Sequence, residues 1–232
     1  MIKNKTFLIT GHTSGLGKAL NIELLKSKNK IIGISKSRSN LKNLIDIEVD
    51  FLNFIKLKKK LNRIKKLKKI DYVILNAGLL GDLENLSKID IKKFQNILNV
   101  NFLSNKIIID YLLSSKIKIK NIISISSGAA LKAKYAWGPY CVSKAATKMM
   151  MDVYSIENNK INFINLAPGL IKTKMQKQIF YTKKKYSSLK KFKYLYKNNL
   201  IDSPEIVAKK LINFLPKIKK SDIALYIDLR NE

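Results

Sequence analysis

A serine, a tyrosine and a lysine stand at positions from which their side chains can meet. Ser127 follows an apolar run, residues 121–126, that has the composition of a buried strand. Tyr140 and Lys144 are four residues apart, so on a helix they lie on the same face. Open α/β sheets bind their ligands at the carboxyl ends of the strands. A hydroxyl, a phenol and an ammonium can therefore converge there and move a proton to or from a substrate.

Carbonyl reduction is the reaction that these three side chains suit. A free phenol has a pKa of about 10, which is poorly matched to proton transfer near neutral pH. Lowering that pKa by ~3 units needs roughly 4 kcal/mol of differential interaction, which close charges in a partly desolvated site supply. We therefore expect Lys144 to lower the pKa of Tyr140, and Tyr140 to protonate a substrate oxygen. The alternative is a surface pair without chemistry.

A glycine-rich turn lies near the start of the chain. Residues 5–10 form a β-rich run, Gly11, Gly15 and Gly17 follow, and an apolar pattern at helical spacing begins at Leu16. Strand, glycine turn and helix are the context that a dinucleotide-binding turn requires. The glycines would let the backbone approach a pyrophosphate, which the amino end of a helix favours electrostatically. An ordinary tight turn is the alternative.

The end of the second predicted strand, residues 30–35, indicates the cofactor type. NAD sites carry an acidic residue about 20 residues beyond the first glycines, where it holds the ribose hydroxyls. This segment has no acidic residue there and offers Lys36 and Arg38, which suit a 2′-phosphate. We therefore expect NADP(H) rather than NAD(H). The alternative is that both are ordinary surface cations in a lysine-rich chain.

The remaining elements predict the fold class. The predicted strands at 45–49, 71–75, 121–126, 161–166 and 223–227 alternate with predicted helices at 53–69, 91–115, 140–157 and 204–215. This alternation predicts an α/β protein: a single-domain Rossmann fold over residues 1–232, doubly wound, with a mainly parallel seven-stranded sheet and helices on both faces.

Residues 170–200 are rich in lysine, tyrosine and phenylalanine. They follow the predicted sixth strand, which is where a lid over a substrate would begin. We therefore expect this stretch to be a substrate lid. The alternative is two lysine-rich helices with a buried aromatic face.

The net charge of +30 suggests an anionic partner at first sight. Nucleic-acid readers, however, lean on arginine, and this chain has only Arg38, Arg63 and Arg230 among its 46 basic residues. The lysines are spread through the chain, which indicates biased codon usage in an AT-rich genome. We do not expect a nucleic-acid partner, although a nucleic-acid-binding protein on a dehydrogenase scaffold stays an alternative.

Three further features concern location and metals. Cys141 is the only cysteine, which excludes an internal disulfide and fits a reducing cytoplasm. No window has the roughly 18 apolar residues of a membrane span, and the first residues lack a signal-peptide pattern. His12 is the only histidine, and we expect no metal site. A cytoplasmic protein without a membrane partner is the expectation.

Taken together, the motifs resemble the short-chain dehydrogenase/reductase family over nearly the whole chain. The matching motifs, in family order and at family spacing, are Thr10-Gly11-x-x-x-Gly15-x-Gly17, Asn76-Ala77-Gly78, Asn101, Ser127, Tyr140-x-x-x-Lys144 and Pro168-Gly169. The resemblance implies a catalytic tetrad of Asn101, Ser127, Tyr140 and Lys144. In it Ser127 would hold the carbonyl oxygen, Lys144 would also bind the nicotinamide ribose, and Asn101 would support a water chain. From the residues alone, Asn101 fits a structural polar network equally well.

The same resemblance implies the contacts of the cofactor. The implied cofactor-binding residues are Gly11, Thr13, Ser14, Gly15, Leu16, Gly17, Lys36, Asp50, Phe51, Asn76, Ala77, Gly78, Tyr140, Lys144, Pro168, Gly169, Ile171 and Thr173. Of these, Asp50 and Phe51 would lie near the adenine, and the residues after Pro168 would lie by the nicotinamide.

A narrower resemblance concerns the substrate. The segments 127–130, 138–141 and 167–176 are similar to the sepiapterin reductase and bacterial benzil reductase branch. In that branch an aspartate near the carboxyl terminus can anchor a pterin amino group, and Asp228 holds a comparable place, although a plain strand-end carboxylate is the alternative. Trp137 and Met175 are the other predicted substrate contacts. The loop 131–139 is a predicted wall of the pocket.

The resemblance therefore implies an NADPH-dependent reductase of a small ketone or diketone. The alternatives within the enzyme class are a 3-oxoacyl-carrier-protein reductase and a sugar or polyketide tailoring reductase. Two helices, around residues 107–112 and 149–151, are more apolar than one buried face needs. Dimer interfaces bury such surface, so we expect a homodimer or homotetramer.

Overall fold

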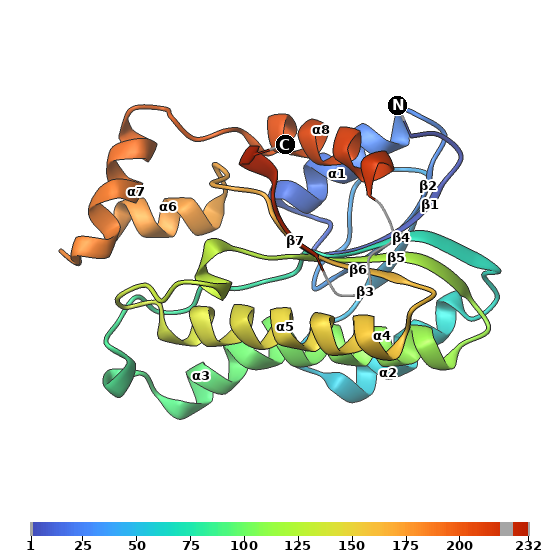
Figure 1. The fold of residues 1–232 in the computed structure, drawn as a ribbon, viewed down its shortest axis with the longest axis horizontal. Helices are drawn as coiled ribbons and strands as arrows, with labels where there is room; N and C mark the ends of the chain where they lie inside the picture. Colours follow the sequence, from blue (N-terminus) through green and yellow to red (C-terminus); the bar gives the residue numbers. More distant parts are fainter. Residues whose placement is uncertain (1, 219–224, 232) are drawn as a thin grey trace.

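Seven parallel strands form a single sheet in the order β3-β2-β1-β4-β5-β6-β7 (Figure 1). The computed structural model describes residues 2–218 and 225–231. The strands are β1 (Thr6–Thr10), β2 (Lys30–Ser35), β3 (Leu44–Glu48), β4 (Lys69–Leu75), β5 (Lys118–Ile125), β6 (Asn162–Ala167) and β7 (Leu225–Asp228). The order reverses between β1 and β4, which is the point where such sheets bind ligands. The predicted doubly wound Rossmann sheet is confirmed, and every pairing is parallel.

Helices cover both faces of the sheet (Figure 1). On one face lie α1 (Gly15–Leu25) and α8 (Pro204–Phe214), and on the other lie α2 (Phe54–Leu61), α3 (Ile91–Leu98), α4 (Ser104–Ser114) and α5 (Gly138–Glu157). Two more helices, α6 (Lys174–Tyr181) and α7 (Ser187–Lys197), stand beyond the edge of the sheet. Single 3-10 turns occupy Asn62–Ile64, Leu86–Lys88, Gly128–Ala130, Leu215–Lys217 and Leu229–Asn231.

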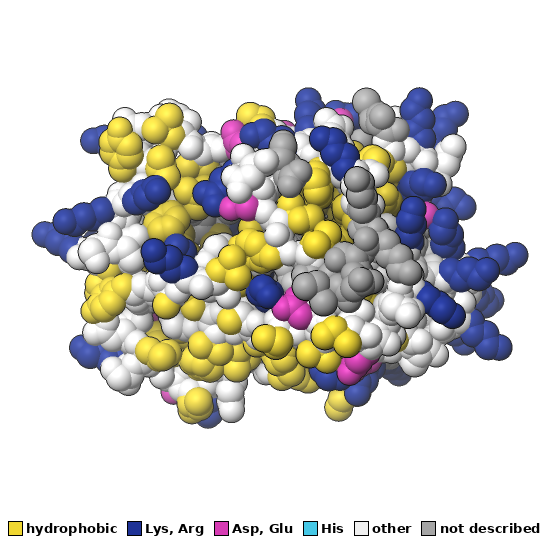
Figure 2. All heavy atoms as spheres, in the orientation of Figure 1, with side chains coloured by type: hydrophobic (Ala, Val, Ile, Leu, Met, Phe, Trp, Pro, Cys, Tyr) yellow, Lys and Arg dark blue, Asp and Glu magenta, His cyan; other side chains and the backbone are white. Residues whose placement is uncertain are grey.

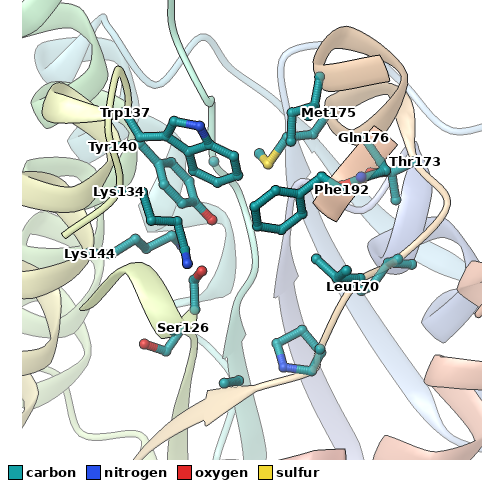
Figure 3. A pocket seen from close by; sticks show the side chains of 18 of the residues that line it. Ser126, Lys134, Trp137, Tyr140, Lys144, Leu170, Thr173, Met175, Gln176 and Phe192 are labelled. Atoms are coloured by element: carbon teal, nitrogen blue, oxygen red, sulfur yellow. The ribbon is translucent and has the colours of Figure 1, made fainter. Parts of the chain in front are cut away.

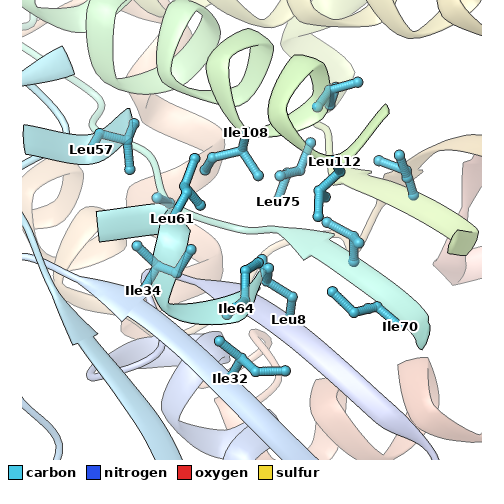
Figure 4. Close-up of a cluster of buried hydrophobic side chains, with 14 of the residues drawn as sticks. Leu8, Ile32, Ile34, Leu57, Leu61, Ile64, Ile70, Leu75, Ile108 and Leu112 are labelled. Carbon is cyan, nitrogen blue, oxygen red and sulfur yellow. The ribbon is translucent and has the colours of Figure 1, made fainter. Parts of the chain in front are cut away.

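The strands are rich in isoleucine because both of their faces are covered. On the side of α2 and α4, Leu8 and Ile32 of the sheet meet Leu57, Ile108 and Leu112 of the helices, all of them at most 1 % exposed (Figure 4). A second apolar cluster fills the space between the sheet and the helices α1 and α8. Burial on both sides holds the carboxyl ends of the strands at one edge.

Lysine and arginine side chains cover much of the periphery of the molecule, and acidic side chains are few on the face that Figure 2 shows. None of the helices in the described part of the chain is both long and apolar enough to cross a membrane.

Two helical stretches differ in detail from the prediction. The helix predicted over 53–69 ends at Leu61, and the chain then passes through a 3-10 turn into β4. The stretch predicted to be helical over 91–115 is helical from Ile91 to Ser114, but a π-helical segment, Asn99–Leu103, that the sequence did not indicate separates α3 from α4. Such single-turn π segments occur frequently at functional sites. The last strand is described from Leu225, so positions 223 and 224 of its prediction lie outside the described residues.

The first turn of α5 fixes the tyrosine of the opening motif. The helix begins at Gly138, and Pro139 stands in its first turn, where its missing N–H costs nothing. A Cβ at Gly138 would lie 2.5 Å from Leu86 Cδ1, so glycine lets the exposed Leu86 side chain pack against the start of the helix. Tyr140 therefore lies in the first turn of α5 and Lys144 one turn later.

Candidate active site

A cavity of about 610 Å³ lies at the carboxyl edge of the sheet (Figure 3). Asn76 and Gly78 after β4, Ser126 and Ser127 after β5, and Pro168 after β6 all line it. These residues come from neighbouring strands beside the switch point of the sheet, so the cavity occupies the place that the sequence predicts for ligand binding.

Ser127, Tyr140 and Lys144 line this cavity together. Tyr140 is only 6 % exposed, and its burial raises its pKa to about 12, although a hydrogen bond with Ser127 acts in the opposite direction. The Lys144 ammonium donates to the Ile125 carbonyl at 2.7 Å, and it lies 5.7 Å from the centre of the Tyr140 ring. Burial lowers the pKa of Lys144 to about 8.

The expected lowering of the Tyr140 pKa by Lys144 is not found in this structure. Desolvation of the phenol outweighs every other influence, and the Lys144 ammonium directs its hydrogen bond to a backbone carbonyl instead of the phenol. In a dry environment the charged form of each group is disfavoured, so the tyrosine and the lysine both shift toward neutrality.

Asn101 lies behind the cavity and is fully buried in the π-helical segment. Its side-chain oxygen accepts from the Leu79 N–H at 2.7 Å, and its amide nitrogen donates to the Leu79 carbonyl and to Ser143 Oγ. A methyl group placed on Gly78 would lie 3.5 Å from Asn101 Oδ1 and 3.8 Å from Lys144 Nζ. Asn101 therefore fixes the loop after β4 beside Lys144 and does not line the cavity itself.

The glycine turn after β1 is tied to the end of β4. Gly11 has a φ of +65°, and a Cβ there would lie 2.9 Å from the Ala77 Cα, so this position requires glycine. Thr10 Oγ1 accepts from the N–H groups of Asn76 and Ala77, both at 2.9 Å. The Asn76 amide donates to the carbonyls of Thr10 and Gly11. The two strand ends at the switch point are thereby locked together.

The amino end of α1 lies beside the cavity, although Gly11, Thr13, Ser14, Gly15 and Gly17 are not among the lining residues. Leu16 in its first turn lines the cavity, and Ser14, its N-cap residue, makes no side-chain cap hydrogen bond. The first N–H groups of the helix thus have no side-chain acceptor, which suits a pyrophosphate. Gly15 faces Thr173, whose Cγ2 would lie 3.2 Å from a Cβ at that glycine. The turn and the loop after β6 therefore adjoin.

The two cations that are predicted to bind a 2′-phosphate, Lys36 and Arg38, follow β2, and their acidic partners lie at the end of β3. Lys36 forms an ion pair with Asp50 at 2.8 Å, which lowers the pKa of that carboxyl, and Arg38 pairs with Glu48 at 3.0 Å. The side chains of Lys36 and Arg38 are 77 % and 79 % exposed, so these pairs are weak and can rearrange. Beside them, Thr13 Oγ1 lies 3.2 Å from Ser37 Oγ.

The remaining predicted cofactor residues divide into two groups. Pro168, Gly169, Ile171 and Thr173 line the cavity opposite Tyr140. The side chain of Phe51 is 6 % exposed and belongs to the hydrophobic core, which leaves its backbone as the part that can face an adenine.

The predicted substrate residues do not all reach the cavity. Trp137 and Met175 line it, and the Phe192 ring of α7 lies 5.1 Å from the Trp137 ring (Figure 3). Asp228 is not among the lining residues. Both of its carboxylate oxygens accept from the Arg230 guanidinium, and Arg230 itself lines the cavity.

The sequence did not predict the place of the buried His12 or two of the residues that line the cavity. His12 is fully buried on the side of β2, its Nε2 lies 3.4 Å from Asp46 Oδ1, and desolvation lowers its pKa. A Cβ on Gly33 would lie 2.3 Å from the His12 ring, so a glycine within a strand was the available signal. Phe192 and Lys134, unlike His12, line the cavity. The sequence predicted that their segments, the loop 131–139 and the stretch 170–200, adjoin the substrate, but it did not single out these two residues.

This geometry defines a class of protein. A parallel sheet with a glycine turn at its switch point, joined to a tyrosine, lysine and serine in one cavity, is the framework of a dinucleotide-dependent oxidoreductase. The comparison with protein families agrees, since the model of the short chain dehydrogenase family matches residues 5–184. The chain belongs to this family, whose members are oxidoreductases that use a nicotinamide cofactor.

Individual proteins of this family are similar to the chain over most of its length. An uncharacterised oxidoreductase of Schizosaccharomyces pombe is 33 % identical over 186 residues, which cover 75 % of this chain and 74 % of that protein. A benzil reductase ((S)-benzoin forming) of Bacillus cereus is 29 % identical over 235 residues, covering 90 % and 92 %. The crystal structure of a short chain dehydrogenase/reductase of Saccharomyces cerevisiae has a TM-score of 0.86 at 25 % identity, covering 97 % and 96 %.

Proposed function

We propose that this enzyme uses NADPH to reduce a small ketone or diketone to the corresponding alcohol. The observation that carries the proposal is a single cavity with the Tyr140 phenol on one wall and the apolar side chains of Trp137, Met175 and Phe192 around it. The benzil reductase name of a relative that covers most of the chain supports a diketone.

The residues divide the chemistry among them. NADPH supplies the hydride when it is bound. Tyr140 donates a proton to the carbonyl oxygen, and Ser127, which already bonds the phenol, holds that oxygen in place. The Lys144 ammonium lies 5.7 Å from the centre of the Tyr140 ring; when it is charged it favours the phenolate that proton donation leaves behind, an effect that burial of both groups outweighs in this structure. Asn101 positions Gly78 and Leu79 at the wall beside Lys144 and acts through them.

The preference for NADPH rests on the end of β2. Lys36 and Arg38 are exposed, and each of their acidic partners is a weak surface contact that a 2′-phosphate can replace. A phosphate recruits such cations through charge-assisted hydrogen bonds. We expect a higher kcat/KM with NADPH than with NADH, and Lys36→Glu should reduce or reverse that ratio.

The decisive experiment is Tyr140→Phe, assayed with benzil and NADPH. Turnover should fall by about a thousandfold, since general acid catalysis contributes 10²- to 10⁴-fold. NADPH binding, measured by the quenching of protein fluorescence, should survive. Tyr194→Phe is the matched control, because Tyr194 is 63 % exposed and lies outside the cavity. Unchanged turnover in Tyr140→Phe would refute the mechanism, and turnover confined to 3-oxoacyl thioesters would replace the substrate class.

We also propose that the enzyme self-associates through α5, since Ile108, Ile109 and Leu112 of the other helix expected at the interface, α4, are buried in the core of the subunit. Met149, Val153 and Ile156 on α5 are 62 %, 44 % and 69 % exposed, and they recur at the spacing of one helix face. Burial of such a stripe is typical of subunit interfaces. Light scattering at two protein concentrations should give the mass of a dimer or tetramer, and a strict monomer would contradict this part of the proposal.

A further inference from the structure

The charge of the cavity lining is one-sided. Lys132 and Lys134 of the loop before α5, Lys191 of α7 and Arg230 line the cavity together with Lys144, and within the described ranges no Asp or Glu lines it. Elsewhere on the molecule lysines find acidic partners, as Lys36, Lys106 and Lys210 do. An uncompensated cluster of cations inside a concave, partly apolar site raises the local concentration of anions.

Three of these lysines have no ionic partner among the described residues. Lys132, Lys134 and Lys191 form no salt bridge with any acidic residue of the described part of the chain. The Lys144 ammonium donates a hydrogen bond to the Ile125 carbonyl, and the Arg230 guanidinium forms an ion pair with Asp228. The free positive charge of the cavity thus lies on Lys132, Lys134 and Lys191.

The position of Lys134 relates this charge to the catalytic tyrosine. The Trp137 ring lies 5.9 Å from the Tyr140 ring, and the Phe192 ring lies 5.1 Å from the Trp137 ring. The Lys134 ammonium lies 5.5 Å from the centre of the Phe192 ring. Figure 3 shows Lys134 on the same wall as Trp137 and Tyr140, facing Phe192. Because the Trp137 and Phe192 rings contact each other, a ring-sized substrate body that rests against this pair would have Tyr140 beside the Trp137 ring and the Lys134 ammonium beside the Phe192 ring.

The helix α7 adds to the same field. Ser187, Ser188 and Lys191 of its first turns line the cavity, and its first turn contains no acidic residue. The amino end of a helix carries a partial positive charge. A neutral substrate would leave Lys132, Lys134, Lys191 and this helix end without a counter-charge, whereas an anionic group would supply one.

The cofactor phosphates are not the natural partners of these lysines. The glycine turn and the loop after β6, which adjoin through Gly15 and Thr173, lie at the cofactor side. Lys132, Lys134 and Lys191 come instead from the loop 131–137 and from α7, which form the wall around Trp137 and Phe192.

We propose that the cavity selects carbonyl compounds that carry a carboxylate on an apolar or aromatic body, with Lys134 and Lys191 as its specificity-determining residues. This inference rests on the proposed reductase function and names the substrate class of the same site. The carbonyl lies at Tyr140, the apolar body rests against the contacting rings of Trp137 and Phe192, and the carboxylate accepts hydrogen bonds from the ammonium groups of Lys134 and Lys191.

The test compares an acid with its ester. Para-acetylbenzoate and its methyl ester have the same ring and ketone, and they differ in one negative charge. The wild-type enzyme with NADPH should show a kcat/KM at least about tenfold higher for the acid, since one charge-assisted hydrogen bond corresponds to about a tenfold change in affinity. The advantage should shrink at high ionic strength, because salt screens exposed charges.

The double variant Lys134→Gln, Lys191→Gln should lose most of the advantage of the acid and leave kcat/KM for the ester within about threefold. The matched control is the double variant Lys190→Gln, Lys197→Gln. It also removes two positive charges, both from exposed positions of α7 outside the cavity. Equal kcat/KM for acid and ester in the wild type, or equal losses on both in the cavity variant, would overturn the inference while the reductase function stands.

A binding measurement separates this inference from the reductase proposal. Benzoate and benzamide are not reduced, so their dissociation constants, measured by titration of the NADPH-loaded protein, do not depend on turnover. Benzoate should bind at least about tenfold more tightly, and only the cavity variant should lose the difference. If neither ketone is turned over, this result still supports the anion preference, and equal binding of the two compounds refutes it.

Discussion

The two walls of the cavity are built in different ways. The wall of Ser127, Tyr140 and Lys144 belongs to β5 and α5, and Tyr140 and Lys144 are only 6 % and 7 % exposed. The opposite wall is the segment 170–200, which contains α6 and α7 and stands beyond the edge of the sheet (Figure 1). The first wall packs on the central hydrophobic core through α5, whereas the second is attached through a smaller apolar cluster, in which Ile179 and Leu189 pack with Trp137 and Tyr140, and through a few polar contacts.

The polar attachments of the second wall are specific and few. Tyr186 donates to Glu84 at 2.8 Å, and Lys184 forms an ion pair with the same carboxylate. Gln178 donates to the Gly81 carbonyl, and Ser188 donates to the Tyr135 carbonyl. Proton transfer thus resides in the first wall, and the second wall adds Met175, Lys191 and Phe192 to the substrate contacts that the loop before α5 provides. We propose that the segment 170–200 acts as a lid over the substrate.

The sharpest way to test this division is to remove a charge from the first wall. Lys144→Met should lower kcat by about 10²- to 10⁴-fold, because proton transfer loses the cation beside the phenol. Lys148→Met on the same helix is the control: Lys148 pairs with Asp152 at 2.6 Å and does not line the cavity. Steady-state kinetics with NADPH and benzil measure both. A similar fall in the two variants would show that α5 as a whole, and not Lys144, matters.

A smaller effect is expected from the second wall. Phe192→Leu removes the ring that meets Trp137 and should raise KM about tenfold, since aromatic contacts of this kind contribute about 0.5–1.5 kcal/mol beyond the area they bury. We expect kcat to change by less than about threefold, because the chemistry lies elsewhere. Tyr194→Leu, at an exposed position of the same helix, is the control. A drop in kcat with unchanged KM would contradict the division of roles.

The smallest effect is expected at the attachment between the two walls. Hydrogen bonds from Lys184, the Asn85 N–H and Tyr186 lower the pKa of Glu84 to about 2. A depressed carboxyl pKa stabilises the contact above the ordinary pKa of about 4.3, and this contribution is lost as the pH falls toward 2. Glu84→Gln should therefore raise KM a few-fold, by the same factor at every pH from about 5 to 8. A ratio of KM values that varies across this range would show that another group controls the attachment.

Local patterns made the fold and the first wall predictable. The glycine turn is a short stretch between a strand and a helix, and the Tyr140–Lys144 spacing places both on one helix face. Strand runs rich in isoleucine indicated a sheet covered on both sides, and the seven strands follow that pattern. Each of these predictions depends on residues within about one helical turn or one strand of each other.

Long-range contacts could not be predicted from the same sequence. Glu84 meets Lys184 and Tyr186 about a hundred residues later, and one acidic residue among so many lysines does not indicate which lysine it pairs with. Asp228 is occupied by Arg230 two residues away, an arrangement that the family resemblance did not contain. The burial that raises the Tyr140 pKa likewise depends on Trp137 and the surrounding wall, not on the Tyr140–Lys144 spacing.

The π-helical segment Asn99–Leu103 has a consequence for how this chain can vary in length. An α-helix turns by about 100° per residue, so removing one residue to restore a regular helix would rotate α4 by about that angle relative to α3. Ile108, Ile109 and Leu112, now at most 1 % exposed, would swing away from the sheet. A one-residue deletion in this segment would misplace Asn101 and remove α4 from its packing against the sheet. Changes of length should therefore be tolerated in 170–200 but should prevent folding in Asn99–Leu103.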